Sequence, residues 1–309
     1  MRLVGEIAIH IRQTKVTLSG PVSLEATLEC GQAFRWQRAR FPGRSELPVA
    51  YRGVIGDLAV AVGQEDRVTN EILVAWQESP EPRSDFEDGV SDLVRRYFSD
   101  GDDIEAIEDR LSRSGGVMAE AVRHGRGLRI LTQTPWECLA SYVLSLNKNI
   151  PSISKTIEYL ATCYGEPAGM GAFAFPAPEA IASQEVSSLR ESKCGFRDKY
   201  LHDAAKKVAL GELDLSLLES MPIALARQEL MKVRGVGPKV ADCVLLFGYH
   251  RLEVFPVDVW IARAVSRYFL DGKPASPGRV REYGERRFGP LAGYAQEHLF
   301  YWIRTTAPR

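Results

Sequence analysis

The segment Met231-Lys-Val-Arg-Gly-Val-Gly-Pro-Lys-Val240 decides how the chain is interpreted, because it joins two helical patterns through a very short turn. Gly235 suits the position just past the first helix, and Gly237 with Pro238 suits the start of the second. A helix–hairpin–helix over residues 231–240 is therefore predicted, and the free amides at such a turn bind a phosphate oxygen. The alternative is a tight helical turn that uses glycine for backbone reasons alone.

Lys239 weakens that alternative. It lies near the second position of the new helix, where an exposed cation faces the positive end of the helix dipole at a cost of about 0.3–1 kcal/mol. A local preference that is violated without compensation indicates function. The dipole and burial both favour a neutral amine, which is a nucleophile. Cys243 follows four residues later and is expected on the same helix face.

A second unusual feature is Val254-Phe-Pro-Val-Asp258-Val-Trp260, an extended stretch with a proline that leads into an aspartate. Asp258 is placed to cap a helix that begins at Val259. Taken alone, it is a structural cap. Because it follows Lys239 by 19 residues, it can also face that amine and stabilise positive charge on a sugar.

The rest of the chain changes character near residue 86, after a polar, proline-marked connector at 80–84. Before it, β-rich stretches are broken by glycine and proline, at 13–19, 34–37, 49–55 and 58–62. After it, apolar residues recur at helical spacing. Two such sets are Val90, Leu93, Val94 and Tyr97, and Leu139, Tyr142, Val143 and Leu146. Helices are expected at 153–163, 179–187, 198–210, 224–233, 238–248, 259–270, 280–288 and 294–304. We predict an α+β fold with an N-terminal β-sheet domain (1–110) and a helical core (111–309).

Composition narrows the class of protein. With 45% hydrophobic and 26% charged residues, the 309-residue chain is typical of soluble globular proteins. Apolar runs such as 240–248 are too short to cross a bilayer, and the first residues lack the pattern of a signal peptide. We expect an intracellular location and no membrane partner. The five dispersed cysteines indicate reduced thiols, and no zinc or iron–sulfur ligand spacing is present.

Charge is distributed unevenly, although the net charge is only −1. Residues 1–110 carry 13 basic and 20 acidic side chains, a balance of −7, whereas residues 190–309 carry 20 and 14, a balance of +6. Any surface that faces phosphates is therefore expected in the last third of the chain.

These residues resemble the 8-oxoguanine DNA glycosylases of the helix–hairpin–helix superfamily, over residues 20 to 305. Five motifs carry the resemblance in order: Gly31-Gln-Ala-Phe-Arg-Trp36, Ser145-Leu-Asn-Lys-Asn-Ile150, Gly235-Val-Gly-Pro-Lys-Val-Ala-Asp-Cys243, Phe255-Pro-Val-Asp258, and Gly289-Pro-Leu-Ala-Gly-Tyr-Ala-Gln296 with Phe300. The resemblance implies an antiparallel sheet domain followed by a two-lobed helical core. It also implies a monomer that acts on double-stranded DNA containing a damaged base and requires no cofactor.

The resemblance implies a bifunctional reaction on an extruded nucleotide. Lys239 would attack C1′, displace the base and form a Schiff base, and β-elimination would then nick the strand. Asp258 would support the charged transition state. The alternatives are a glycosylase for an alkylated purine or oxidised pyrimidine, and a non-catalytic DNA-binding module. The presence of both Lys239 and Asp258 argues against the module.

The same resemblance implies which residues bind the base. The Gly31 carbonyl would accept from the N7–H that 8-oxoguanine has and guanine lacks, so guanine would leave a buried acceptor unpaired at a cost of about 1–3 kcal/mol. Phe300 and Cys243 would sandwich the base, with Pro256 nearby. Gln296 would read its Watson–Crick edge.

DNA contacts are implied as well. Asn147 would fill the gap left in the duplex, Phe196 would act as a wedge and Arg197 would contact the orphaned cytosine, whereas the turn at Gly235 and Gly237 would hold a phosphate. Without the resemblance, Asn147 is a helix cap and Phe196 a packed ring. The backbone carbonyls of Met231, Val233 and Val236 could hold a monovalent or divalent cation at the hairpin.

Three positions depart from the family pattern. Ser152 stands where an arginine that reads the opposite cytosine is usual, Lys148 replaces an asparagine, and Trp260 replaces a histidine. The loss of one base-reading pair weakens discrimination by about 1–3 kcal/mol. We therefore predict a relaxed preference for the base opposite the lesion.

Overall fold

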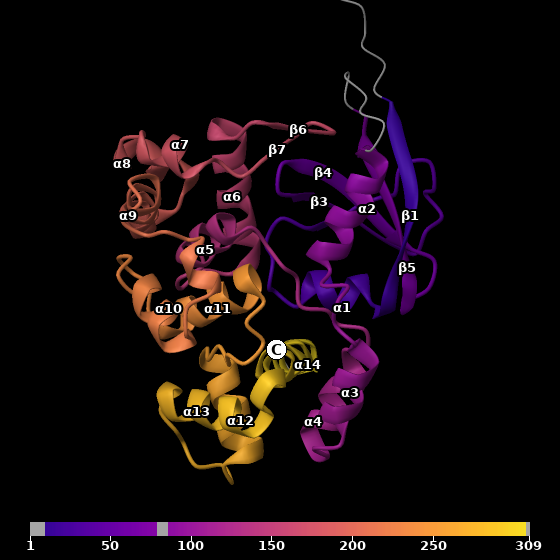
Figure 1. Ribbon diagram of the computed structural model, residues 1–309, viewed down its shortest axis with the longest axis vertical. Coiled ribbons are helices and arrows are strands. Elements are labelled where there is room, and N and C mark those ends of the chain that lie inside the picture. The colour runs from indigo at the N-terminus through magenta and orange to yellow at the C-terminus, as the bar shows by residue number, and fades with distance from the viewer. Residues whose placement is uncertain (1–9, 79–85, 307–309) are drawn as a thin grey trace, which may run out of the picture.

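Among the residues that the computed structural model describes, 10–78 and 86–306, five antiparallel strands form a sheet in the first part of the chain (Figure 1). Their order in the sheet is β1-β5-β4-β3-β2. The strands are β1 (Ile11–Val22), β2 (Gln37–Arg38), β3 (Val49–Ile55), β4 (Leu58–Gln64) and β5 (Thr69–Gln77). The N-terminal antiparallel sheet is thus confirmed, while the connector at 80–84 lies outside the described residues.

The turn between β3 and β4 fixes the register of the middle of this sheet. Ile55 pairs with Leu58, which leaves a two-residue loop of Gly56 and Asp57. Gly56 has φ +61°, the left-handed conformation that tight hairpin turns require and glycine supplies. One face of the sheet buries Val62 and Trp76 against α2 (Phe86–Tyr97), so the domain has an apolar core of its own.

Helices make up most of the remaining chain (Figure 1). A first group is α5 (Pro135–Leu144), α6 (Ile150–Tyr164), α7 (Pro178–Ala182), α8 (Val186–Leu189), α9 (Asp198–Ala209), α10 (Ile223–Leu230) and α11 (Pro238–Tyr249). A second group is α12 (Val259–Phe269), α13 (Pro277–Phe288) and α14 (Ala292–Thr306), against which α3 (Ile104–Ser112) and α4 (Gly116–His124) lie. The helical core therefore has the two lobes that were expected.

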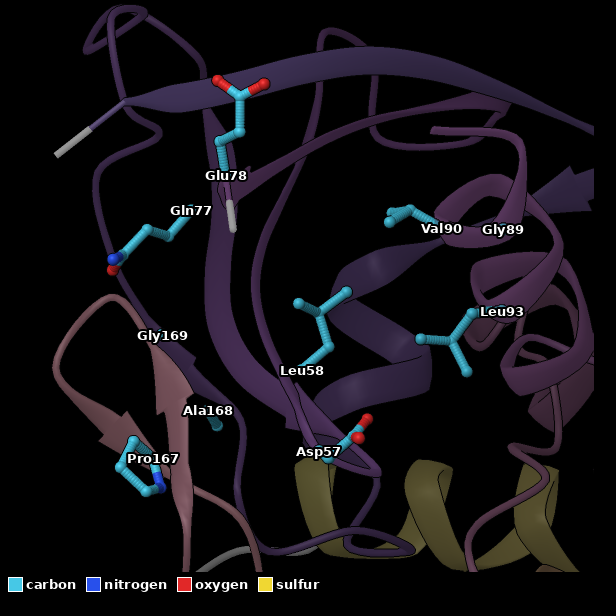
Figure 2. A pocket seen from close by; sticks show the side chains of 10 residues that line it. All are labelled: Asp57, Leu58, Gln77, Glu78, Gly89, Val90, Leu93, Pro167, Ala168 and Gly169. Atoms are coloured by element: carbon cyan, nitrogen blue, oxygen red, sulfur yellow. The ribbon is translucent and has the colours of Figure 1, made fainter. Parts of the chain in front are cut away.

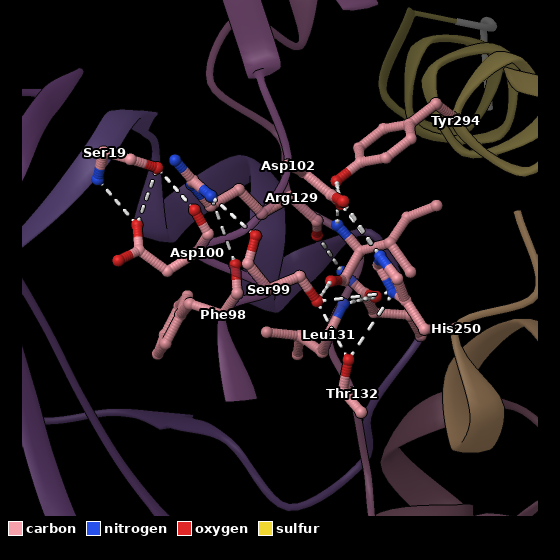
Figure 3. Close-up of polar contacts among 12 residues, drawn as sticks. Ser19, Phe98, Ser99, Asp100, Asp102, Arg129, Leu131, Thr132, His250 and Tyr294 are labelled. Atoms are coloured by element: carbon pink, nitrogen blue, oxygen red, sulfur yellow. Dashed lines mark hydrogen bonds and ion pairs between the residues drawn. The ribbon is translucent and has the colours of Figure 1, made fainter. Parts of the chain in front are cut away.

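The sheet domain is tied to the helices by a polar network around Asp102 (Figure 3). Its carboxylate accepts from the hydroxyl of Tyr294 on α14 and lies 3.0 Å from Nε2 of His250, the residue that ends α11. Buried Arg129 donates to the carbonyl of Ser99 at 3.0 Å. The predicted division between the two domains, after residue 110, falls within α3, and we retain it as a proposal.

Several sequence-based boundaries needed correction. The strand expected at 34–37 is wrong for most of its length, because the buried ring of Phe34 packs edge-on against Tyr142 and pairing begins only at Gln37. The helix expected at 179–187 is two short helices separated at Ser183. Elements that were not predicted are α1 (Leu24–Glu29), β5, α3, α4 and the hairpin of β6 (Pro167–Gly169) with β7 (Ala172–Phe173).

A pocket of about 490 Å3 lies where the β6–β7 hairpin meets the sheet domain (Figure 2). Leu58, Val90 and Leu93 give it an apolar side, and none of the residues predicted to bind DNA lines it. Within 10–78 and 86–306, no helix combines the length and apolarity needed to cross a membrane.

Candidate active site

The hairpin forms as the sequence predicts. The first helix, α10, ends at Leu230, the second, α11, begins at Pro238, and the side chain of Val236 is buried between them. Gly235 has φ +85°, and a Cβ atom there would lie 2.5 Å from the ring of Tyr200 on α9. Gly237 caps α11 in an extended conformation, with nothing within 4 Å of an added Cβ. The turn is therefore exposed on one side and packed on the other.

Lys239 is at the start of α11, and its amine lies over the aromatic ring of Tyr142 on α5. Its Nζ is 4.9 Å from the ring centroid of Tyr142, and no hydrogen bond or ion pair joins it to another described residue. Tyr142 is itself fixed, because its hydroxyl donates to the Gln32 carbonyl at 3.1 Å and its ring stacks on Phe247. Sequence periodicity placed Tyr142 in the helical core and gave no signal that it supports the lysine.

Asp258 occupies the position that was expected of a cap. Its Oδ1 accepts from the amide of Ile261 at 2.8 Å and so begins α12. No ion pair within 4 Å joins it to Lys239. The two charges nevertheless act on one group, because Lys239 lowers and Asp258 raises the pKa of the Cys243 thiol. Burial is the larger cause and raises that pKa to about 12, so Cys243 is a neutral, apolar side chain suited to stacking.

Gly31 lies against the C-terminal helix. It has φ +103°, and an added Cβ would lie 2.7 Å from the guanidinium of Arg304 and 3.5 Å from the ring of Phe300. Arg304 donates to the carbonyl of Cys30 at 2.8 Å and sits 5.1 Å from the Phe300 ring centroid. The backbone corner that carries the predicted N7–H acceptor is thus held by α14, the helix that carries Gln296.

Gln296 is more deeply buried than Phe300, although a glutamine is usually exposed and a phenylalanine is usually buried. Gln296 is only 4% exposed and its Oε1 has no hydrogen-bond partner among the described residues, whereas Phe300 is partly exposed. A polar side chain that is buried and unpaired costs about 1–3 kcal/mol, and such groups occur where a ligand binds. Pro256 is also buried, in the stretch that leads to Asp258.

Glu297 is a candidate that the sequence interpretation missed. It is 3% exposed, one of its carboxyl oxygens has no partner, and burial raises its pKa to about 7. The carboxyl raises the pKa of the Cys30 thiol, which is buried beside Gly31. An acidic residue next to Gln296 in a helix whose neighbours are mostly buried was the available signal.

The residues expected to enter the duplex lie on two adjacent turns. Asn147 is exposed with φ +49°, and the cap of α6 is Asn149, so Asn147 has no capping role. The ring of Phe196 is 53% exposed and contacts Tyr200 edge-on. Neither side chain has the purely structural role that was its alternative.

Arg197 binds the backbone of these turns. It is 7% exposed and donates to the carbonyls of Asn147, at 3.1 Å, and Cys194, at 3.0 Å, as well as to that of Leu146. Lys148 adds a second tie through the carbonyl of Lys193 at 3.1 Å. Arg197 would therefore have to exchange these bonds to contact an orphaned cytosine, and that role remains a proposal.

Metal ligands of the usual kinds are not gathered among the described residues, where no three His, Cys, Asp or Glu side chains come together. The five cysteines are all free thiols. At the hairpin, the Val233 carbonyl accepts from the Val236 amide at 3.0 Å. Cation binding by the carbonyls of Met231, Val233 and Val236 stays a prediction.

Comparison with known proteins matches this arrangement to two family models. Residues 15–139 match the N-terminal domain of 8-oxoguanine DNA glycosylase, and residues 132–290 match the HhH-GPD superfamily of base excision DNA repair proteins. A probable N-glycosylase/DNA lyase of Methanothermobacter thermautotrophicus is 31% identical over 92% of this chain and 94% of its own.

Two solved structures have the same fold over nearly their whole length. MBOgg1 in complex with a low affinity DNA ligand is 35% identical, with a TM-score of 0.84 and coverage of 97% of this chain and 99% of its own. The Clostridium acetobutylicum 8-oxoguanine glycosylase/lyase, in complex with double-stranded DNA containing cytosine opposite 8-oxoguanine, is 30% identical with a TM-score of 0.81 and the same coverage.

The fold and the site together define a base excision DNA glycosylase with a helix–hairpin–helix. The chain belongs to the HhH-GPD superfamily and, within it, to the 8-oxoguanine DNA glycosylases.

Proposed function

We propose that this protein removes 8-oxoguanine from double-stranded DNA and then cleaves the strand through a Schiff base on Lys239. The observation that carries the proposal is the position of the Lys239 amine, which lies 4.9 Å from the ring centroid of Tyr142 and has no hydrogen bond or ion pair to another described residue. Lys239, Asp258 and Glu297 all shift the pKa of the Cys243 thiol, and Glu297 lies on α14, the helix that borders Gly31 and carries Phe300. A nucleophile, a carboxylate and the predicted base-binding residues thus converge on one region.

The reaction follows from these groups. The lone pair of Lys239 Nζ forms a bond to C1′ of the extruded nucleotide while the bond from C1′ to N9 breaks and the base leaves. The base leaves with the electron pair of the broken bond and takes a proton from water. A proton then passes from the nitrogen to O4′ as the bond from C1′ to O4′ breaks, which opens the sugar and gives the Schiff base. Removal of a C2′ proton then expels the 3′ phosphate, and water releases Lys239. Asp258 stabilises the positive charge on the sugar during the first step.

Recognition of the lesion is proposed to depend on the Gly31 carbonyl. Arg304 binds the neighbouring Cys30 carbonyl, and Phe300 lies beside Gly31, so this backbone corner is packed against α14 when guanine arrives without its N7 donor. The buried acceptor is then unpaired, which disfavours guanine by about 1–3 kcal/mol. Cys243 and Phe300 would enclose the base, with Pro256 nearby.

The DNA duplex is proposed to dock on the hairpin and on the turns of Asn147 and Phe196. The amides near Gly235 and Gly237 would bind a phosphate, and the exposed Phe196 ring would enter the stack. The protein would act as a monomer without a required cofactor, inside the cell.

Borohydride trapping on a duplex with one 8-oxoguanine tests the proposal. Wild type should give a covalent protein–DNA adduct and Lys239→Gln none. Lys232→Gln is the matched control, because Lys232 is an exposed lysine of the same hairpin that pairs with Glu229 at 2.6 Å. An adduct with Lys239→Gln would refute the assignment of the nucleophile, and a lesion panel with alkylated purines and oxidised pyrimidines would identify another substrate.

A further inference from the structure

We propose that Glu297 is a second reader of the Watson–Crick edge, where its carboxyl accepts a hydrogen bond from the N2 amino group of the extruded base. Glu297 would thus be a specificity-determining residue for purines with a 2-amino group. The inference rests on the proposed function and adds a contact that none of the predicted base-binding residues supplies.

The position of Glu297 on α14 is the first support. It precedes Phe300 by three residues and Arg304 by seven, so the three side chains share one face of the helix. That face lies against Cys30 and Gly31, as the contacts of Phe300 and Arg304 show. Glu297 therefore points toward the corner at which the base is expected.

Its electrostatic neighbours surround the same region. The carboxyl of Glu297 acts on groups from three other elements, and it is itself acted on by Asp258 and Arg304. Those groups are Cys30 at the end of α1, Tyr142 on α5 and Cys243 on α11. Tyr142 lies under the Lys239 amine, and Cys243 is a predicted wall of the base site.

The Glu297 carboxyl has hydrogen-bond neighbours in the Cys30 thiol and the Gln296 side chain, which lower its pKa, but neither carries a compensating positive charge. Its Oε2 is buried without a partner, and no ion pair within 4 Å joins it to a cation of the described residues. Arg304 is the cation that acts on Glu297 electrostatically, but it donates its hydrogen bond to the Cys30 carbonyl. A buried carboxyl that stabilises a fold normally has such a partner, as Asp242 has in Arg227 at 2.6 Å.

The neighbouring Gln296 completes the pattern, because its Oε1 is also buried and unpaired. Two adjacent unpaired acceptors call for a ligand with two adjacent donors. The edge of 8-oxoguanine presents N1–H and the N2 amino group side by side, next to the O6 acceptor. Gln296 can donate to O6 and accept from N1–H, which leaves the N2 amino group for Glu297. An adenine-type edge has an acceptor at N1 and no amino group at C2.

The experiment measures single-turnover excision from duplexes that contain 8-oxoguanine or 8-oxohypoxanthine, which differ only in the 2-amino group. Wild type should prefer 8-oxoguanine by about 10-fold or more. Glu297→Ala should slow 8-oxoguanine excision by about the same factor and leave 8-oxohypoxanthine within about threefold. Glu297→Gln retains an acceptor and should keep most of the preference. If Glu297→Ala does not fold, Glu297→Leu fills the space without an acceptor.

Glu108→Ala is the matched control. Glu108 is a second buried acid, but its Oε1 accepts from the Gly127 amide at 2.6 Å and so has a structural partner. This variant should affect both substrates equally. Equal losses on both substrates with Glu297→Ala, or a preference that the variant leaves intact, would overturn the reader role while wild-type activity upholds the proposed function. Failure of wild type to excise 8-oxoguanine would overturn both.

Discussion

The ring of Tyr200 lies so close to the backbone of Gly235 that a Cβ atom there would meet three ring atoms within 2.9 Å. The same ring contacts Phe196 edge-on, with centroids 5.8 Å apart. One side chain of α9 thus connects the proposed phosphate-binding turn to the proposed wedge. DNA bound at the hairpin would therefore be positioned relative to the residue that enters the stack.

Gly235→Ala should destabilise the protein by at least about 2 kcal/mol, because alanine both strains a left-handed backbone and displaces Tyr200. Urea denaturation measures this effect, and fluorescence anisotropy with a duplex should show weaker binding. Gly237→Ala is the control, since its φ is −103° and an added Cβ meets nothing within 4 Å. Equal stability losses in both variants would contradict the packing that we describe.

Asp258 has two roles, and two substitutions separate them. Asp258→Ala removes the cap of α12 and should cost about 1 kcal/mol of stability, whereas Asp258→Asn retains a capping acceptor and should cost less. Both remove the carboxylate charge, so both should lower single-turnover excision by about 100-fold or more. Thermal unfolding and excision rates on the same preparations provide the comparison. Normal turnover in Asp258→Asn would reduce the residue to a cap.

The helical core could be predicted from sequence to a large extent, because proline and capping residues mark where helices begin. Pro238 and Asp258 start α11 and α12 as their positions indicate. Sequence patterns were less informative in the sheet domain. The strand β5 follows a loop without the turn residues that identify β3 and β4, and besides β4 it pairs with β1, whose partner residues are 47 to 66 positions away. Such long-range pairing leaves little local signal.

The site could be predicted only in part, and the resemblance to a family carried most of it. Local patterns alone identified Lys239 and Asp258. Lys239 departs from a helix-end preference, because it is a cation at a helix N-terminus, and Asp258 follows one, because aspartate is a preferred N-cap. They would have assigned Phe300 to the core and Gln296 to the surface, whereas the structure buries Gln296 more deeply. Glu297 was missed because its place beside Gln296 does not by itself indicate burial, which depends on tertiary contacts with Cys30 that α14 makes only in the folded chain.

Glu297→Gln should reduce the loss of folding stability that occurs as the pH rises from acid to neutral. Burial raises the pKa of Glu297 from 4.5 to about 7, so the folded state binds more protons than the unfolded state between these values. Wild-type stability should therefore fall as pH rises from 4.5 through 7, by up to about 3 kcal/mol from this group. Denaturation at pH 5 and pH 8 measures the effect.

Comparison of wild type with Glu297→Gln isolates the contribution of Glu297 to the pH dependence of stability. Glu108 and Glu137 also have pKa values raised by burial to about 7, but they are present in both. The groups that face Glu297 are likewise unchanged: Cys30, Tyr142, Cys243, Asp258 and Arg304. Parallel stability curves for wild type and Glu297→Gln would show that Glu297 ionises normally.

Ser152→Arg should restore a preference for cytosine opposite the lesion. Ser152 lies in the first turn of α6, three residues after the cap Asn149 and beside the turn that carries Asn147. Wild type has no arginine there, and Arg197 is bound to backbone carbonyls, so we expect excision opposite cytosine and adenine at rates within about 10-fold. An added bidentate contact is worth about 1–3 kcal/mol, which corresponds to about 5- to 150-fold discrimination. Single-turnover rates on the two duplexes measure it, with Ser154→Arg, two residues further along α6, as the control. A strong preference for cytosine in wild type would show that Arg197 leaves its carbonyl partners when DNA binds and reads the base without help from position 152.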